Sequence, residues 1–438
     1  MRKFVTIIVS FVTVFASAET FTLQQCIDTA VANNIALLQQ KNNYATAGIQ
    51  YKQSLANLSP NLSAGASNMW SFGRSTGSDN ITYSSTNAMS TSFNLNASLV
   101  LFDGLAMKFA IDQARASMLS SEASINAAEL QLRLNISSMY LQVLLNKQIL
   151  LAAQEQADDT RRVLHKDSLL VQANRLAEGE LYGVIAQLGN EQLQVVQAHN
   201  DVQLSLLNLA QAMNIDPQDF DIQDIPLEQL QEGAALPSRD EVLALALEQR
   251  PEIQSKQYAI DAQQAMLKQY KAAYSPTLSA NAGMGTSYFA ALNDGATNAA
   301  FGKQLGDNLQ GTVGLTLSIP IYNKMQTPYA VKRQQINLDN ARLALEQQKQ
   351  DIRREVEQAY YNALNALSEA QAAEQALTNA TVALDYLQKK FDAGRASSYE
   401  YTTAKTTFSK AQMTLLRSQY NYLFRLHILH YYAGTPWR

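Results

Sequence analysis

The sequence is poor in the residues that most catalytic and nucleic-acid-binding functions require. It has one cysteine, Cys26, which excludes an internal disulfide framework. Charged residues make up 16% of the 438 residues, where soluble proteins average about 25%, and the net charge is −4. Because no basic patch stands out, no nucleic-acid partner is expected. Glutamine, asparagine, serine and alanine replace the missing charges, so the chain is polar but weakly charged.

The chain has only four histidines, and they do not form a catalytic or metal-binding pattern. His427 and His430 are three residues apart, a spacing that puts both on one helix face. No third ligand or carboxylate stands beside them, so a metal site is not expected. No Ser-His-Asp set, zinc-hydrolase motif or phosphate-binding loop is visible. We therefore expect a protein that is not an enzyme, without catalytic residues or cofactors.

Residues 1–18 have the pattern of a secretory signal peptide. Arg2 and Lys3 precede an apolar run over 4–15, and small residues at 16–18 suit cleavage before Glu19. The alternative is a short membrane anchor, although the run is shorter than the ~20 residues that span a bilayer. No later window is apolar enough for a transmembrane helix. A membrane location would therefore require strands.

Proline is absent from two long stretches, 61–216 and 329–435. The segment 328–393 reads as one helix, about 100 Å long at 1.5 Å per residue. Along it, apolar residues alternate steps of four and three, the pattern of a coiled-coil seam. Alanine fills most seam positions, which predicts a closely approaching partner helix. The seam consists of Ile352, Val356, Ala359, Ala363, Ala366, Ala370, Ala373, Leu377, Ala380, Leu384, Leu387 and Phe391.

The chain also repeats itself, which indicates two internal structural repeats. The segment 59–64 returns 216 positions later as 275–280. Further on, the interval is 220, and asparagine exchanges with glycine at two of the matched positions. Both residues tolerate a left-handed backbone, so these positions are expected to end helices. The matches at this interval are Tyr140 with Tyr360, Asn174 with Gly394, Glu180 with Glu400, and Asn214 with Gly434.

Each repeat is expected to hold a short helix, two membrane strands, a long helix and a second short helix. In the first repeat, 19–214, these cover 20–58, 61–72, 91–102, 105–173 and 176–213. In the second, 238–438, they cover 238–274, 277–288, 311–321, 328–393 and 398–433. The segment 215–237 links the repeats as an equatorial segment. Its prolines and acidic residues predict an excursion over the surface rather than a place in the core.

The four expected strands alternate apolar and small polar residues. In 93–101, for example, Phe93, Leu95, Leu99 and Leu101 alternate with asparagine and serine. Segments of about ten residues with one apolar face fit tilted strands in a membrane. The alternative is a soluble sheet packed on a helix. In a membrane, the loops 73–90 and 289–310 would lie outside the cell.

Four strands cannot close a barrel, and an open edge in lipid leaves backbone groups unpaired at a cost of several kcal/mol each. The chain is therefore expected to assemble with copies of itself. Two copies give an eight-stranded barrel filled by side chains, and three give twelve strands around a lumen. The second face is asparagine, serine, threonine and glycine rather than core residues, which favours a lumen.

With these features the chain resembles the TolC-type outer-membrane efflux proteins over nearly all of the mature sequence. The resemblance is carried by the duplicated layout, by the motifs at 101–104 and 320–323, and by 391–400. It implies a mixed, mainly α fold: a trimeric long α-helical barrel of coiled coils, continuous with a 12-stranded transmembrane β-barrel, four strands per protomer. It implies an outer-membrane location with the helical barrel in the periplasm. The implied partners are a homotrimer, a periplasmic adaptor and an inner-membrane transporter of the RND, ABC or MFS type.

The resemblance also implies roles for residues near the two helix ends. Gly394 is similar to the family's tip-turn glycine, and Asn174 takes its place in the first repeat. Glu400 is at the position of an acidic constriction residue, and Thr403 stands where some members carry a second acid. Phe391 replaces a tyrosine that hydrogen-bonds across the closed gate. Ala396 stands at an arginine of the gate salt bridge, so closure is expected to depend on Phe391 and the alanine seam.

Four charged residues have two interpretations each. Glu400 and Glu180 would form rings in a trimer, and such rings attract cations. Alternatively, they are exposed carboxylates at helix starts, favoured by the macrodipole. Arg175 and Arg395, one residue past each turn, would pair with neighbouring acids or receive an adaptor. Alternatively, they are cations that face solvent.

The sequence therefore predicts a passive exit duct across outer membrane and periplasm, the channel component of a tripartite efflux or type I secretion system. Two rivals belong to other classes. A periplasmic adaptor also carries coiled-coil hairpins, but it would have one hairpin inserted in small β-domains. An outer-membrane barrel enzyme would need a catalytic site, which the sequence does not offer.

Overall fold

The computed structural model describes residues 20–435 except 77–82, 86, 219, 232–234 and 294–295. The expected signal peptide, 1–18, lies outside the described residues. The chain divides into two compact units. Unit 1 comprises 1–41, 124–253 and 347–438, and unit 2 comprises 42–123 and 254–346. Two 67-residue helices, α3 (Ala106–Gln172) and α9 (Gln326–Asp392), contribute residues to both units.

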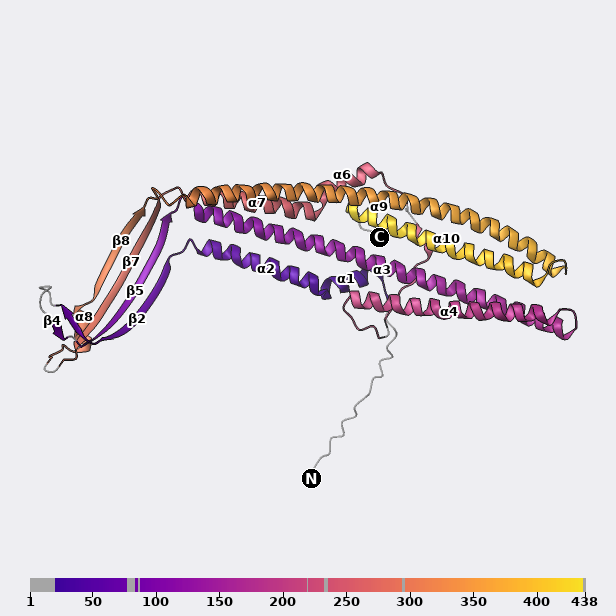
Figure 1. Cartoon of the computed structure of the whole chain (residues 1–438), viewed down its shortest axis with the longest axis horizontal. Coiled ribbons are helices and arrows are strands. Elements are labelled where there is room, and N and C mark those ends of the chain that lie inside the picture. The colour runs from indigo at the N-terminus through magenta and orange to yellow at the C-terminus, as the bar shows by residue number, and fades with distance from the viewer. Residues whose placement is uncertain are drawn as a thin grey trace, which may run out of the picture. The chain divides into compact units, whose positions relative to one another are not determined.

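The remaining helices are shorter and lie on either side of these two in sequence. They are α1 (Leu23–Asn33), α2 (Ile35–Ala56), α4 (Glu178–Ala212), α5 (Leu227–Gln231), α6 (Arg239–Gln249), α7 (Pro251–Ala272), α8 (Phe301–Asp307) and α10 (Ser398–Ala433). The long and second short helices begin and end within two residues of the ranges expected from the sequence. Figure 1 shows α4 beside α3 and α10 beside α9. These two antiparallel hairpins carry the helix ends of interest.

The first helix of each half is broken, where the sequence predicted single helices over 20–58 and 238–274. Asn34 separates α1 from α2 in an extended conformation, and its side-chain oxygen accepts a hydrogen bond from the Leu37 N–H. Arg250 separates α6 from α7 in the same way. Pro251 forces the break, because a proline displaces the preceding residue from helical geometry and itself suits a first helical position. The two breaks lie 216 positions apart.

The segment 215–237 is packed into unit 1, so its expected path over the surface is wrong for its middle part. Strand β6 (Asp221–Ile222) pairs in parallel with β1 (Thr20–Phe21). Phe220, Ile222 and Leu230 are buried in the largest core cluster, with Cys26 and residues of α3, α4 and α10. The hydroxyl of Tyr140 on α3 donates to the backbone oxygen of Gln223. These apolar side chains outweigh the prolines and acidic residues that suggested exposure.

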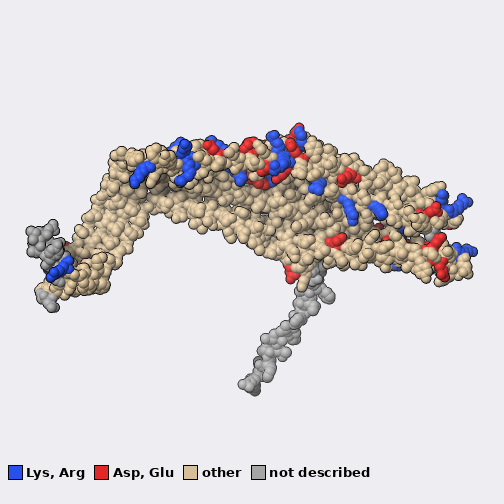
Figure 2. All heavy atoms as spheres, in the orientation of Figure 1, with Lys and Arg blue, Asp and Glu red and all other residues tan. Residues whose placement is uncertain are grey.

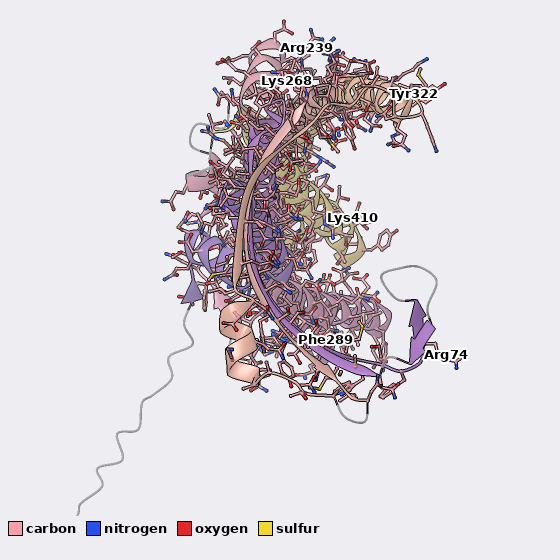
Figure 3. The ribbon with its side chains drawn as sticks, turned by 90° about the vertical axis from the view of Figure 1, so that its left-hand side faces the viewer. Arg74, Arg239, Lys268, Phe289, Tyr322 and Lys410 are labelled. Carbon is pink, nitrogen blue, oxygen red and sulfur yellow. The ribbon has the colours of Figure 1, made fainter. Side chains whose placement is uncertain are left out.

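Unit 2 contains one four-stranded antiparallel sheet, in the order β2-β5-β7-β8 (Figure 1). The strands are β2 (Asn61–Ser71), β5 (Ala88–Phe102), β7 (Thr277–Ala291) and β8 (Gln310–Ser318). A small hairpin, β3 (Arg74–Thr76) with β4 (Tyr83–Ser85), lies between β2 and β5 in sequence. Figure 3 shows the sheet strongly curved, with Phe289 of β7 towards one end and Tyr322, just after β8, towards the other.

The strand ends differ from the expected ranges for local reasons. β8 ends at Ser318 rather than 321, since Pro320 cannot donate to a ladder. β7 continues to Ala291, beyond the last residue that β8 pairs with, Gly285. Beyond Gly285, amide side chains form hydrogen bonds with the β7 backbone that a neighbouring strand would otherwise form. Gln304 both donates to and accepts from the backbone of Phe289, and Asn298 does the same at Ala291.

The pairing register gathers the apolar side chains on one face of the sheet. Leu62, Ala97, Ala282 and Val313 form one row across the four strands. Val313, Leu315 and Leu62 are 91%, 71% and 67% exposed, so no helix packs over this part of the face. Towards the far end of β7, the short helix α8 contacts the same face, where the ring of Phe301 lies edge-on to that of Tyr288. Within the described ranges, no helix has the length and apolarity needed to cross a membrane.

The expected seam of α9 is the least exposed stripe of that helix. Ile352, Val356, Ala363 and Ala366 are at most 2% exposed, and the other seam positions are buried or half-buried. Val242 of α6 and Leu429 of α10 pack against its first part. Small side chains at the seam let the neighbouring backbones approach closely, as the alanine content predicted.

Left-handed residues recur at the interval of 220 found in the sequence. Positive φ angles occur at four pairs of positions: Gly104 and Lys324, Leu105 and Met325, Asn174 and Gly394, and Asn214 and Gly434. The first two pairs mark where a strand passes into a long helix. The other two mark helix ends, where a left-handed residue satisfies free carbonyl groups.

Candidate functional site

The first helix turn of interest joins α3 to α4 in unit 1. Asn174 has a φ of 53°, and the N–H of Arg175 donates to the carbonyl of Leu170 at 2.8 Å. A hydrogen bond from an N–H to the carbonyl five residues earlier, next to a left-handed residue, is the Schellman motif that ends many helices. Asn174 and Arg175 are exposed, as a contact site for another protein requires. Glu180 follows in the first turn of α4 and is half-buried.

The second turn joins α9 to α10 and has the same closure. Gly394 has a φ of 67°, and the N–H of Arg395 donates to the carbonyl of Lys390 at 2.8 Å. Ser397 then caps α10. Its hydroxyl accepts from the Glu400 N–H, while the Glu400 carboxylate accepts from the Ser397 N–H at 2.9 Å. Gly394 and Arg395 are exposed, like their counterparts in the first turn.

The capping box also fixes the charge of Glu400. Hydrogen bonds from the backbone N–H and the hydroxyl of Ser397 lower the pKa of the Glu400 carboxyl below its usual range. The side chain is therefore an anion at neutral pH. Glu400 and Thr403 together line a shallow 380 Å³ hollow with Ala383 and the seam residues Ala380 and Leu387. The structure thus brings these two expected site residues together at the seam.

Phe391 lies outside that hollow, in a cluster that joins the two hairpins. Its ring stacks on the ring of Tyr401 of α10, with centroids 5.0 Å apart and planes 11° from parallel. The ammonium of Lys166 of α3 lies 4.6 Å from the Phe391 centroid and 3.1 Å from the carboxylate of Asp392. We call Lys166, Phe391, Asp392 and Tyr401 the aromatic bridge. Only Phe391 was expected from the sequence, because the other three give no signal before the hairpins are placed side by side.

A second link between the hairpins is polar and buried. Lys405 of α10 is 6% exposed, and its ammonium donates to the Thr160 hydroxyl of α3 at 3.3 Å. Glu191 of α4 is 3% exposed. One of its oxygens accepts from Gln156 at 2.9 Å and Gln187 at 2.8 Å. Its other oxygen has no hydrogen-bond partner among the described residues. Lys405 could have been noticed in the sequence, since it falls between Tyr401 and Phe408 in the apolar spacing of α10.

The two histidines of the His-x-x-His spacing lie on α10. Burial lowers the pKa of His427 to about 4, so this side chain is neutral at physiological pH. The Nδ1 atom of His430 lies 3.0 Å from the Thr435 hydroxyl. In the part of the chain that the structure describes, no three His, Cys, Asp or Glu side chains come together as a metal site would require. The candidate site is therefore the pair of turns and the links behind them.

Comparison with known proteins shows the family of the chain. The model of the outer membrane efflux protein family matches residues 26–214 and 242–435, which include both turns, all four sheet strands and both long helices. The chain belongs to the outer membrane efflux protein family. The two matched segments also correspond to the two halves of the chain on either side of the 215–237 segment.

Two relatives illustrate the family. The cation efflux system protein CusC of Escherichia coli strain CFT073 is 25% identical over 418 residues, which cover 90% of this chain and 82% of CusC. The outer membrane protein TolC of Escherichia coli K12 is 25% identical over 345 residues, 77% of this chain and 68% of TolC. A solved structure of CusC superimposes with a TM-score of 0.79 at 19% identity, over 94% of this chain and 92% of that one. Because the identity is only 19%, the comparison with the solved structure shows similarity of fold and nothing more.

In this outer membrane efflux protein the two hairpins are joined by side-chain contacts of α3 with α9 and α10. The resemblance implies a hydrogen-bonding tyrosine and an arginine salt bridge, where this chain has Phe391 and Ala396. Here the aromatic bridge and the Lys405 contact link α10 to α3. Glu180 and Glu400 occupy matching first turns of α4 and α10.

The buried Lys405 predicts an unusual pH dependence. Burial, together with the nearby Arg162, lowers the pKa of Lys405 to about 8 although Glu191 opposes this. The unfolded chain holds the proton up to a pKa near 10.4, so stability should rise between pH 8 and 10. Between pH 7.5 and 9.5 we expect a gain of about 2 kcal/mol from this group. Thermal melting of the helical circular dichroism signal measures it.

The matched variant is Lys405→Met, which keeps an unbranched side chain one atom shorter and removes the proton equilibrium. Its melting temperature should change less than that of the unmodified protein between pH 7.5 and 9.5. Equal pH dependence in both proteins would mean that Lys405 does not titrate in this range.

Proposed function

We propose that this protein is the trimeric outer-membrane duct of a tripartite efflux or type I secretion system. The observation that carries the proposal is a four-stranded sheet with one exposed apolar face and two free edges, on a chain of the outer membrane efflux protein family. The protein performs no chemistry itself, and an inner-membrane transporter supplies the energy. The helical segments form a barrel of coiled coils in the periplasm.

The sheet supports closure by copies of the same chain. Its outer strands are β2 and β8, and because each neighbouring pair is antiparallel, β2 and β8 run in opposite directions. The β8 edge of one copy can therefore pair with the β2 edge of the next as another antiparallel step. Twelve strands from three copies satisfy every edge, which lipid requires. Eight strands from two copies would enclose a face that lacks the large apolar side chains of a filled barrel.

The matching positions of the two halves support two structural repeats. Helix breaks recur at an interval of 216, and left-handed residues recur at 220. In this arrangement the turns at Asn174 and Gly394 form the periplasmic tip. Exposed Asn174, Arg175, Gly394 and Arg395 then offer contacts to a periplasmic adaptor. The transporter, of the RND, ABC or MFS type, and the adaptor determine the cargo.

In this proposal, the contacts between the two hairpins keep the tip closed. The aromatic bridge holds α9 and α10 against α3, and release of these contacts would let the hairpins separate. Glu400, with Glu180 and Thr403, lines the constriction in this proposal, and the alanine seam allows the helices to approach closely. The experiment that tests the duct is planar-bilayer recording, in which the trimer should conduct and should open further when tip contacts are removed.

Glu400→Gln provides a test of the constriction. Three carboxylates held near one another attract cations, so the substitution should weaken the cation preference in a salt gradient. Glutamine also forms a capping box, so the start of α10 is preserved. The reversal potential is the measurement. An unchanged reversal potential would place Glu400 away from the conducting path, on a solvent-facing helix start.

A further inference from the structure

The four sheet strands contain no charged residue at all. All of their residues, Asn61–Ser71, Ala88–Phe102, Thr277–Ala291 and Gln310–Ser318, are described, and none is Asp, Glu, Lys, Arg or His. On the face seen in Figure 2, the strands are tan, whereas blue and red side chains are distributed along the helices. Contact with lipid requires the apolar face to be free of charged residues, but it places no such requirement on the polar face.

The polar face carries amides and hydroxyls that bind one another. The amide of Asn96 donates to the side-chain oxygen of Asn94 at 3.2 Å, and that of Asn281 donates to the Thr316 hydroxyl at 3.2 Å. Ser67 and Ser92 are joined by their hydroxyls at 2.8 Å. The hydrogen-bonding groups are therefore partly satisfied within the sheet, and no charge is needed to balance them.

Glycines give the asparagine side chains room to lie along the sheet. Asn94 pairs with Gly65 on one side and Gly285 on the other, and Asn96 pairs with Gly283. A Cβ atom at Gly65 would lie 2.8 Å from the Asn94 oxygen, and one at Gly283 would lie 3.3 Å from the Asn96 oxygen. The asparagine side chains thus occupy the space over the neighbouring strands instead of standing out from the sheet.

We propose that this face lines the duct as an uncharged surface of amides and hydroxyls that passes solutes of either charge sign. Selection by charge is then made at the helical tip, outside the sheet. A ring of carboxylates or ammonium groups would be required for a preference within the strands, and none is present. This inference rests on the proposed function, because only a closed barrel turns the polar face into a lumen.

Cysteine probing tests the inference in the full-length protein. The one natural cysteine, Cys26, is fully buried, and burial raises the pKa of its thiol to about 12, so it is unreactive. Asn96→Cys places a thiol near the middle of β5 on the polar face. Leu95→Cys is the matched control at the same depth on the other face. Cationic and anionic methanethiosulfonates are added from the external side of a bilayer, and their rates are divided by their rates with free cysteine.

In an uncharged passage the two corrected rates at Asn96→Cys should agree within about threefold, whereas a charged cleft biases ions of one sign by roughly 10- to 1,000-fold. Leu95→Cys should react with neither reagent. A preference above about tenfold for one sign at Asn96→Cys would overturn the uncharged passage and leave the duct intact. If Leu95→Cys reacts and Asn96→Cys does not, or if neither reacts, the polar face is not a water-filled lumen and the proposed function fails with it.

Discussion

The Leu315→Lys variant is expected to lose its trimeric form in outer-membrane extracts. Leu315 lies at the middle of β8, 71% exposed on the apolar face of the sheet. A lysine facing lipid near the bilayer midplane costs about 2–4 kcal/mol, and a trimer would carry three of them. Each 1.4 kcal/mol is a factor of about ten in an equilibrium, so the assembled form should become undetectable. Electrophoretic migration before and after heating measures the loss.

Thr316→Lys is the control for this prediction. It introduces the same side chain at the next residue of the same strand, but on the polar face, which lines the lumen of the proposed trimer. It should assemble like the unmodified protein, because the new ammonium group meets water. If both variants assemble, or if both fail, the two faces of β8 do not separate lipid from water.

The Phe391→Ala variant is expected to increase leak of large antibiotics through the outer membrane by about five- to seventyfold. The substitution removes a stacked aromatic pair, about 0.5–1.5 kcal/mol, and a cation–π contact, about 0.5–1 kcal/mol. A combined loss of about 1–2.5 kcal/mol shifts a closed-to-open equilibrium by that factor. The ion pair of Lys166 with Asp392 is exposed and adds little. Uptake of a large antibiotic in intact cells measures the leak.

Tyr386→Ala is a matched control for the aromatic bridge. Tyr386 lies on the same helix and also has a cation–π contact, with Lys390 at 4.8 Å, but both partners belong to α9. Removing it breaks no link between the hairpins, so leak should stay at the level of the unmodified protein. Equal leak in Phe391→Ala and the unmodified protein would show that the aromatic bridge does not hold the tip closed.

Local patterns in the sequence were sufficient to place the main elements. Proline-free stretches with steps of four and three gave the long helices, and alternation gave the strands. The exchange of Asn174 with Gly394 indicated the turns, because left-handed backbone strongly limits which residues can stand there. The break at Arg250 is not predicted by the pattern, because the helical periodicity is the same on both sides of it. Pro251 is the local signal that indicates the break.

Features that depend on distant contacts were missed. Phe220, Ile222 and Leu230 are buried because α3, α4 and α10 cover them, which local composition cannot reveal. The aromatic bridge joins residue 166 to residues 391 and 401, and no local pattern connects positions so far apart. Glu191 and Lys405 are charged residues at buried positions, where composition alone predicts exposure. Assembly is a property of several chains and can only be inferred from the unpaired edges.

The mass of the purified, detergent-bound particle tests the account most directly, because the four-stranded sheet needs partners to close. Native mass spectrometry should give three copies of the chain, and removal of detergent should cause precipitation. A monodisperse single copy that stays dissolved without detergent would contradict the account, because a lone sheet would then tolerate its free edges and exposed apolar face in water.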